Sequence, residues 1–362
     1  MKKIILLWAA CVMTAAGARA QRLQVVDSEG NAVAYASVLN PKAEYIGITD
    51  LEGVVPDVGG TTEVTVSHVA FKAKSVTLGG ADAVVVLEDA DFDMPEIVVQ
   101  PKPLIYVQTF YRMYIYSSED GIVYYRAGLT DNTYDPARKA VKGKTEVATK
   151  AKYAILRTIF GMVGGKMNQY SQISPKSFEE RMEERGKDVQ LKFTRTAPGR
   201  QLITDCKGTV GSVTDDMADH LRRFSYSASL LFRHNLEVKG KAGLTDKMEK
   251  ADGKMRNKEE SDYFLYRIDD EGRYGPEDFV MSQNMMSWDS EKDGKTEHII
   301  IAMQVFSTDR AYVTRDELGQ RQRQNRMKMS YQNIRRFEKD HNIPALPAAV
   351  QQKLGEIWKL GD

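Results

Sequence analysis

The chain has 362 residues, 28% of them charged and 42% hydrophobic, and a formal net charge of +1. This near-neutral balance excludes the strongly basic class of nucleic-acid-binding proteins. Two cysteines, Cys11 and Cys206, are too few for a disulfide framework or a four-thiolate zinc site.

The first twenty residues have the three parts of a secretion signal. Lys2 and Lys3 form a basic start, an apolar run follows from Ile4 to Met13, and Ala18-Arg19-Ala20 matches the small-x-small cleavage pattern. The run is shorter than the roughly 20 apolar residues that cross a bilayer, and no later stretch of that length and apolarity occurs. We therefore predict an exported protein without a transmembrane segment in its mature chain.

Export would place the protein in the periplasm or at the outer membrane, with residues 1–20 removed and Gln21 first. The alternative is a lipoprotein signal in which Cys11 is lipidated. Trp8 stands where such signals usually have a Leu-like residue, and cutting there would leave a very short apolar core, so cleavage after Ala20 is favoured. The strand-like surroundings of Cys206 predict a small, half-buried core residue without a disulfide partner.

Residues 21–100 are predicted to form a small all-β module. Short runs of β-branched and apolar residues alternate at even spacing with turns that contain Gly and Asp. The expected strands cover 23–26, 33–38, 45–49, 64–67, 75–78, 83–87 and 97–99. Seven strands of this length are typical of a sandwich of two packed sheets.

Several short elements of this module stand in a characteristic order. They are Val25, Asp27, Gly30, Ala36 and Val38, then Gly47, Thr49-Asp50 and Gly53, then Val66 to Phe71, Val84 to Leu87 and Pro95 to Val99. Through them residues 22–99 resemble the carboxypeptidase-like regulatory domain, a transthyretin-like seven-stranded sandwich. Ala70 departs from the family, which more often has Gly there. The domain occurs at the N-terminus of TonB-dependent transporters and other exported gram-negative envelope proteins, so the resemblance implies a role in binding or assembly.

The charge changes sign after this module. Residues 21–100 contain 4 Lys and Arg against 13 Asp and Glu, a net charge of −9, whereas residues 101–362 contain 44 against 37, a net charge of +7. The change supports a boundary near Pro101-Lys102-Pro103. Residues 101–362 are therefore predicted as a separate α+β domain.

Strands dominate the first part of this second domain. Tyr106–Tyr116 and Ile122–Arg126 predict a β-hairpin whose tyrosines pack a core, with stacking on a flat ligand such as a sugar as the alternative. Further strands are expected at 188–196, 201–207, 222–239, 263–268, 278–289 and 297–307. Residues 239–262 are charged and predict a long exposed loop.

The expected helices alternate with and follow these strands. They are an amphipathic helix at 151–163, a short charged helix at 177–185, one that starts at the capping box Thr314-Arg315-Asp316-Glu317, one that ends before Asn342-Ile343-Pro344, and a terminal helix with an apolar stripe from Leu346 to Trp358. Together they predict a mostly antiparallel sheet with flanking helices. A curved form of that sheet would be loosely like the half-barrel lipoprotein carriers of the periplasm, by analogy alone.

A basic stretch follows the capping box and contains Arg321, Arg323, Arg326 and Lys328. A charge run of this kind is typical of a solvated helix face. A patch that holds an acidic lipid or polysaccharide is the alternative.

One motif raises the question of a zinc peptidase. His234-Asn235-Leu236-Glu237 matches the HxxE ligand pair of zinc carboxypeptidases, and His298 could supply a third ligand. A chance match is expected at a rate of ~0.3 for a chain with five histidines. No segment offers the general-base Glu or the substrate-binding Arg, so the motif does not favour a peptidase.

Other catalytic signatures are absent from the sequence, which has no HExxH, GxSxG, Walker A or strand-linked GxGxxG pattern. The sequence thus assigns no catalytic, cofactor-binding or metal-binding residue. It predicts a non-enzymatic exported envelope protein that binds another envelope protein, a glycan or a lipid. A periplasmic carrier of a lipid or other apolar ligand, and a zinc carboxypeptidase-like hydrolase, are the alternatives.

Overall fold

The structure is a computed structural model that describes residues 21–79, 82–92, 102–153, 171–240, 256–292, 294–324 and 330–359. The chain divides into two compact units. The first unit comprises residues 1–67 and 73–88, and the second comprises residues 68–72 and 89–362.

The N-terminal β region has seven strands in two small sheets. The strands are β1 (Leu23–Val26), β2 (Ser37–Leu39), β3 (Tyr45–Ile48), β4 (Val54–Val55), β5 (Glu63–His68), β6 (Phe71–Thr77) and β7 (Ala83–Val86). One sheet has the order β4-β1-β7 and the other β3-β2-β5-β6. Alternate residues such as Leu23, Val25, Val64 and Val66 are completely buried, as expected for strands with one face on a core. The prediction of a small all-β region is confirmed.

The strands of this region differ in detail from those predicted. Residues 33–36 belong to a turn, because Tyr35 has a φ of 63° and strand β2 begins only at Ser37. The hydroxyl of Thr49 holds this turn by donating to the Val33 carbonyl and accepting from the Ala36 N–H, both at 2.8 Å. Strand β4 was not predicted, and the strand expected at 97–99 lies outside the described residues.

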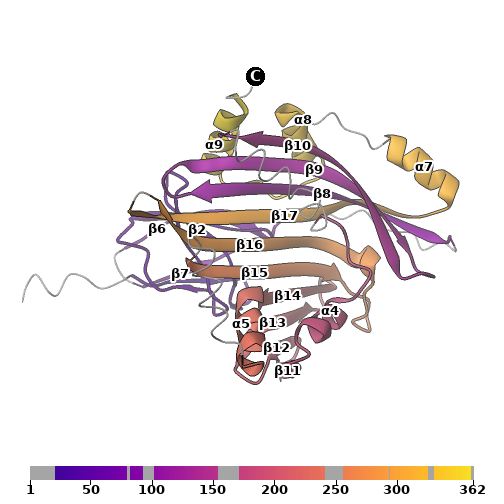
Figure 1. The fold of residues 1–362 in the computed structure, drawn as a ribbon, viewed down its shortest axis with the longest axis horizontal. Helices are drawn as coiled ribbons and strands as arrows, with labels where there is room; N and C mark the ends of the chain where they lie inside the picture. Colours follow the sequence, from indigo (N-terminus) through magenta and orange to yellow (C-terminus); the bar gives the residue numbers. More distant parts are fainter. Residues whose placement is uncertain are drawn as a thin grey trace, which may run out of the picture. The chain divides into compact units, whose positions relative to one another are not determined.

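The second unit contains a ten-stranded antiparallel sheet in the order β10-β9-β8-β17-β16-β15-β14-β13-β12-β11, which Figure 1 shows from β10 at the top to β11 at the bottom. The strands are β8 (Leu104–Ser117), β9 (Gly121–Asp135), β10 (Ala140–Ala151), β11 (Lys192–Ala197), β12 (Arg200–Thr204), β13 (Thr209–Asp216), β14 (Leu221–Ser227), β15 (Arg256–Arg267), β16 (Phe279–Lys292) and β17 (Lys295–Val313). The predicted antiparallel sheet is confirmed.

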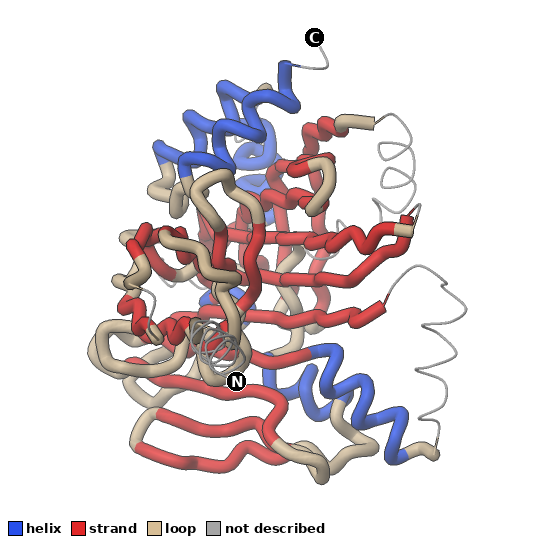
Figure 2. Tube along the Cα trace, turned by 90° about the vertical axis from the view of Figure 1, so that its left-hand side faces the viewer, coloured by secondary structure: helices blue, strands red, loops and turns tan. Residues whose placement is uncertain are grey.

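Five helices accompany the sheet among the described residues. They are α4 (Phe178–Arg185), α5 (Ala228–Val238), α7 (Arg315–Gln324), α8 (Tyr331–Asp340) and α9 (Ala348–Lys359). Figure 2 shows helices gathered at both ends of the stack of strands. None of the helices in the described ranges has the length and apolar character needed to span a membrane.

Two predictions about this unit are wrong. The strand expected at 222–239 ends at Ser227, whose hydroxyl accepts from the Leu230 N–H and so starts helix α5. The loop expected at 239–262 gives way to strand β15 at Arg256, while residues 241–255 lie outside the described residues. Strands β10 and β13 were not predicted. Ala151 ends strand β10, and residues 154–163 of the expected amphipathic helix also lie outside the described part.

The capping boxes are present where helices begin. Ser177 accepts from the Glu180 N–H at the start of α4, and the Glu180 carboxylate accepts from the Ser177 N–H at 2.8 Å. Thr314 and Glu317 form the same pair at the start of α7. These side chains satisfy N–H groups that the first helical turn leaves without intrahelical partners.

Strand β8 is buried along its whole length because both of its faces are covered. Ile105, Val107 and Tyr111 belong to a large hydrophobic cluster that includes Phe178 of α4. On the other face, Leu104 and Tyr106 form a smaller cluster with Val313, against which Ala311 and Leu318 pack. The predicted hairpin 106–126 is confirmed, and six of its tyrosines are each at most 4% exposed: Tyr106, Tyr111, Tyr114, Tyr116, Tyr124 and Tyr125. They pack the core and offer no platform for a sugar.

Candidate ligand-binding groove

A cavity of about 490 Å³ lies between helix α7 and the strands β8, β9 and β10. Its volume is within the range of roughly 300–1,000 Å³ that is typical of small-molecule sites. Its floor consists of alternate residues of two paired strands. Thr133 pairs with Lys142 and Asp131 pairs with Lys144, so these four side chains stand side by side on one face.

Helix α7 forms one side of the groove with residues at helical spacing. Arg315, Leu318 and Gln322 line the cavity, and their spacing of three and four residues places them on one side of the helix. Leu104 at the start of β8 also lines it, and Leu318 packs against the cluster that contains Leu104. The side of the groove near α7 is therefore partly apolar.

Four cations line the groove, and one of them has a partner among the described residues. Arg138 lies 3.7 Å from the Asp135 carboxylate. For Lys142, Lys144 and Arg315, the described part of the chain contains neither a hydrogen-bond partner nor an ion-pair partner. All three are exposed, so their charges are available to a ligand.

The two carboxylates of the groove have partners inside the protein. Asp131 accepts from the Tyr106 hydroxyl at 2.5 Å and from the Gln108 amide at 3.2 Å. Asp135 accepts from the backbone N–H groups of Ala137 and Arg138, which closes the turn between β9 and β10. These acids are therefore less available to a ligand than the three unpaired cations.

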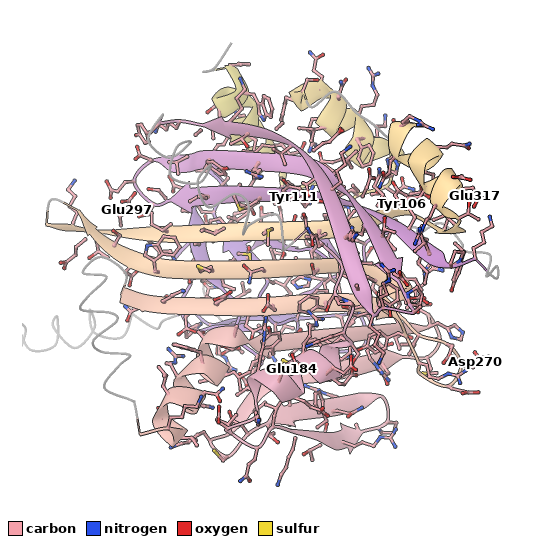
Figure 3. The ribbon with its side chains drawn as sticks, turned by 45° about the vertical axis from the view of Figure 1, so that its right-hand side comes forward. Tyr106, Tyr111, Glu184, Asp270, Glu297 and Glu317 are labelled. Carbon is pink, nitrogen blue, oxygen red and sulfur yellow. The ribbon has the colours of Figure 1, made fainter. Side chains whose placement is uncertain are left out.

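Helix α7 is fixed beside the sheet by charged side chains. Glu317 accepts from Lys102 Nζ at 2.8 Å and from the Thr314 N–H at 2.7 Å, and these hydrogen bonds lower the pKa of Glu317 from its usual 4.5 to about 2. Arg321 forms an ion pair with Asp309 and lies 5.7 Å from the centre of the Tyr106 ring. Figure 3 labels Glu317 and Tyr106 at the same end of the sheet.

The structure shows no metal site at the residues of the HxxE motif. His234 Nδ1 lies 2.6 Å from an Asp205 oxygen, and Glu237 forms an ion pair with Lys207. His298, the third candidate, belongs to β17, and its Nδ1 lies 2.8 Å from Asp289. No group of three His, Cys, Asp or Glu residues within the described ranges could hold a metal ion.

Cys206 is exposed, so the prediction of a half-buried core residue is wrong. Strand β12 ends at Thr204, before the cysteine. The Asp205 carboxylate then accepts from the backbone N–H groups of Lys207 and Gly208, which turns the chain. Cys206 therefore stands in a surface turn.

The predicted basic stretch is only partly a solvated face. Arg321 is half-buried by its contacts with Asp309 and Tyr106, whereas Arg323 is exposed. Arg326 and Lys328 lie outside the described residues. The cations that line the groove are Arg138, Lys142, Lys144 and Arg315, none of which belongs to this basic stretch.

Two carboxylates of strand β9 line the groove. Asp131 and Asp135 are four residues apart on one strand, which separates their backbones by about 13 Å. Among the described residues that line the cavity, Thr133 has the one hydroxyl group, and none is His, Cys or Ser.

One local sequence pattern could have indicated the groove. Lys142 and Lys144 alternate along a strand, which places both charges on the same face. The pairing of that face with α7 joins residues more than 170 positions apart and has no local signature. No protein-family model and no curated protein matches the chain.

Proposed function

We propose that this chain is an exported, non-enzymatic binding protein of the cell envelope. In this proposal the N-terminal β region, which resembles the carboxypeptidase-like regulatory domain, is an adaptor for another envelope protein. The second unit holds a small ligand in the groove between α7 and β8–β10. The observation that carries the proposal is a cavity of about 490 Å³ lined by three exposed cations that have no partner among the described residues.

The two alternatives have different support. A carrier of a lipid or other apolar ligand is supported by the apolar side of the groove at Leu104 and Leu318. A zinc hydrolase has no such support, since His234, Glu237 and His298 each have another partner. We therefore keep the carrier as the second candidate and set the hydrolase aside.

The test is native mass spectrometry of the full chain, produced with its own leader in a gram-negative host. We expect a mature N-terminus at Gln21 and a co-purified small molecule. Thr133→Trp fills the groove from strand β9 and should remove that molecule. Thr194→Trp is the matched control, because Thr194 is an exposed threonine on the edge strand β11 of the same sheet.

Three results would contradict the proposal. The first is a molecule that stays bound in Thr133→Trp, and the second is protein that is empty after gentle purification. The third is turnover of peptides or glycans that disappears when one His or one acid is replaced. An uncleaved leader inside the cell would contradict the export component alone.

A further inference from the structure

The charges around the groove are arranged in a way that selects a ligand class. Lys142 and Lys144 stand on β10, the last strand at one end of the ten-stranded sheet. Residues two apart on a strand are separated by about 7 Å and point to the same side. Arg315 adds a third charge from the first turn of α7. One side of the cavity is thus cationic along β10, and a further cation stands where α7 begins.

The apolar side chains occupy the opposite side. In the sheet, β9 separates β8 from β10, and β17 pairs with the other edge of β8. Helix α7 directly follows β17 in the chain. Leu104 and Leu318 come from these inner elements and belong to one hydrophobic cluster. A ligand that fills the cavity therefore meets Lys142 and Lys144 on the side of β10, and meets Leu104, Leu318 and Arg315 on the side of β8 and α7.

The acids of the groove do not cancel this cationic side. Asp131 is held by Tyr106 and Gln108, and Asp135 is held by the turn that follows it and by Arg138. Formally the cavity has four cations and two anions among its lining residues. An ion pair or charge-assisted hydrogen bond from a ligand would be stronger than one from a neutral group.

We propose that the groove binds an anionic amphiphile, whose phosphate or carboxylate head group contacts Lys142, Lys144 and Arg315 and whose hydrocarbon lies along Leu104 and Leu318. The inference rests on the proposed function, because it names the ligand of the same groove. A volume of about 490 Å³ holds roughly 16 groups of the size of water at about 30 Å³ each. That space suits a head group with part of one hydrocarbon chain.

The probe for the test is decyl phosphate, used below its micelle concentration, with decyl maltoside as the uncharged comparison. Binding to the full mature chain is measured by titration calorimetry at low and high salt. We expect decyl phosphate to bind more tightly than decyl maltoside, with an affinity that falls as salt rises, because exposed charges are screened.

The variant is the triple change Lys142→Gln, Lys144→Gln and Arg315→Gln. We expect it to weaken decyl phosphate binding roughly tenfold or more, since each lost cation contributes a modest amount at an exposed site. The matched control is Lys187→Gln, Lys192→Gln and Arg195→Gln, which removes the same charges from other exposed positions of the same unit without partners among the described residues. We expect the control to stay within about twofold of the wild type.

Binding to lipid vesicles tests whether the anionic head group belongs to a membrane lipid or to a free amphiphile. Co-sedimentation with phosphatidylglycerol vesicles, but not with phosphatidylcholine vesicles, and its loss in the triple variant would identify a membrane lipid as the source. Binding of decyl phosphate without any vesicle binding would identify a free amphiphile. Both results support the anionic class.

The proposal is overturned if the triple variant binds decyl phosphate as well as the wild type does. It is also overturned if decyl maltoside binds equally tightly, or if decyl phosphate does not bind. Thr133→Trp distinguishes this failure from failure of the proposed function. If Thr133→Trp removes the co-purified molecule while the triple variant retains it, the groove is the ligand site and the anionic class is wrong.

Discussion

Glu317 shows how one side chain fixes an element at the groove. Its carboxylate accepts hydrogen bonds from Lys102 before the sheet and from the N–H of Thr314 at the helix start. A carboxylate at a helix N-terminus also interacts favourably with the helix dipole. These two hydrogen bonds therefore help to hold α7, with Arg315 and Leu318, beside the sheet.

We predict that the pKa of Glu317 is about 2, well below its usual 4.5, with the hydrogen bond from Lys102 as the largest cause. Because the folded-state pKa is depressed, the stabilisation is present above about pH 4.5 and is lost as the pH falls towards 2. A ¹³C titration of the side-chain carboxyl measures this value directly. Lys102→Gln should move the midpoint upward, towards 4.5.

The control is Lys353→Gln on helix α9, which removes a positive charge elsewhere in the same unit. It should leave the Glu317 midpoint unchanged. A wild-type midpoint near 4.5, or one that Lys353→Gln shifts as much as Lys102→Gln does, would show that the Lys102 hydrogen bond does not form in solution.

At the scale of elements, the sequence predicted what local patterns determine. The capping boxes at Ser177 and Thr314 marked true helix starts, because their hydrogen bonds form within four residues. The aromatic hairpin was equally clear, since its alternation is typical of strands. These elements needed no information from distant parts of the chain.

The errors come from places where local patterns are ambiguous. Residues 222–239 were predicted as one strand, although Ser227 caps a helix in the middle of the range. Strand β13 was missed because its run Thr209–Asp216 has a Gly and two Asp, which resemble a turn in isolation. The groove was missed altogether, since it joins residues near 104, 131–144 and 315–322.

The pairing of β9 with β10 depends on one glycine. A Cβ added at Gly128 would lie 2.1 Å from the Glu146 carbonyl oxygen on β10 and 3.0 Å from the Tyr111 ring. Backbone cannot move aside as a side-chain end can, so β10 would have to shift. At Gly143, on the same pair of strands, an added Cβ meets only the side chain of Gln172, at 2.7 Å.

We predict that Gly128→Ala destabilises the protein by roughly 1–3 kcal/mol, the usual cost of overpacking. Gly143→Ala should change the free energy of unfolding by less than about 1 kcal/mol, because the Gln172 side chain can rotate away and Gly is a poor strand residue. Urea denaturation of the two variants gives the comparison. Equal losses in both would mean that strand β10 does not pair with β9 in this register.

At the scale of the whole second unit, the C-terminal helices return to the first strands of the sheet. Figure 1 shows α8 and α9 beside β8, β9 and β10. Phe110 lies 5.5 Å from Phe337, and Tyr125 lies 6.3 Å from Trp358, measured between ring centres. Between these aromatic contacts, Arg112 and Glu338 form an ion pair of 2.7 Å in which both side chains are at most 5% exposed.

Neighbouring groups form further hydrogen bonds with the polar atoms of this ion pair. Arg112 also donates to the Gln304 side chain and to the Pro344 carbonyl, both at 2.7 Å, while Arg335 donates to Glu338. Moving two charges out of water often costs more free energy than their mutual attraction returns. The pair therefore contributes less to net stability than to fixing which face of α8 packs on β8.

This balance leads to a prediction about removing one partner or both. Glu338→Leu alone leaves Arg112 buried without its carboxylate and should destabilise the protein by about 3–5 kcal/mol in urea denaturation. The double variant Arg112→Met/Glu338→Leu removes both charges and should recover most of that loss. Arg273→Ala, which breaks the exposed pair with Asp269, is the control and should have little effect. A double variant as unstable as the sum of Glu338→Leu and Arg112→Met alone would show that the two side chains are not coupled, and would contradict the prediction that the single loss comes from an unpaired buried charge.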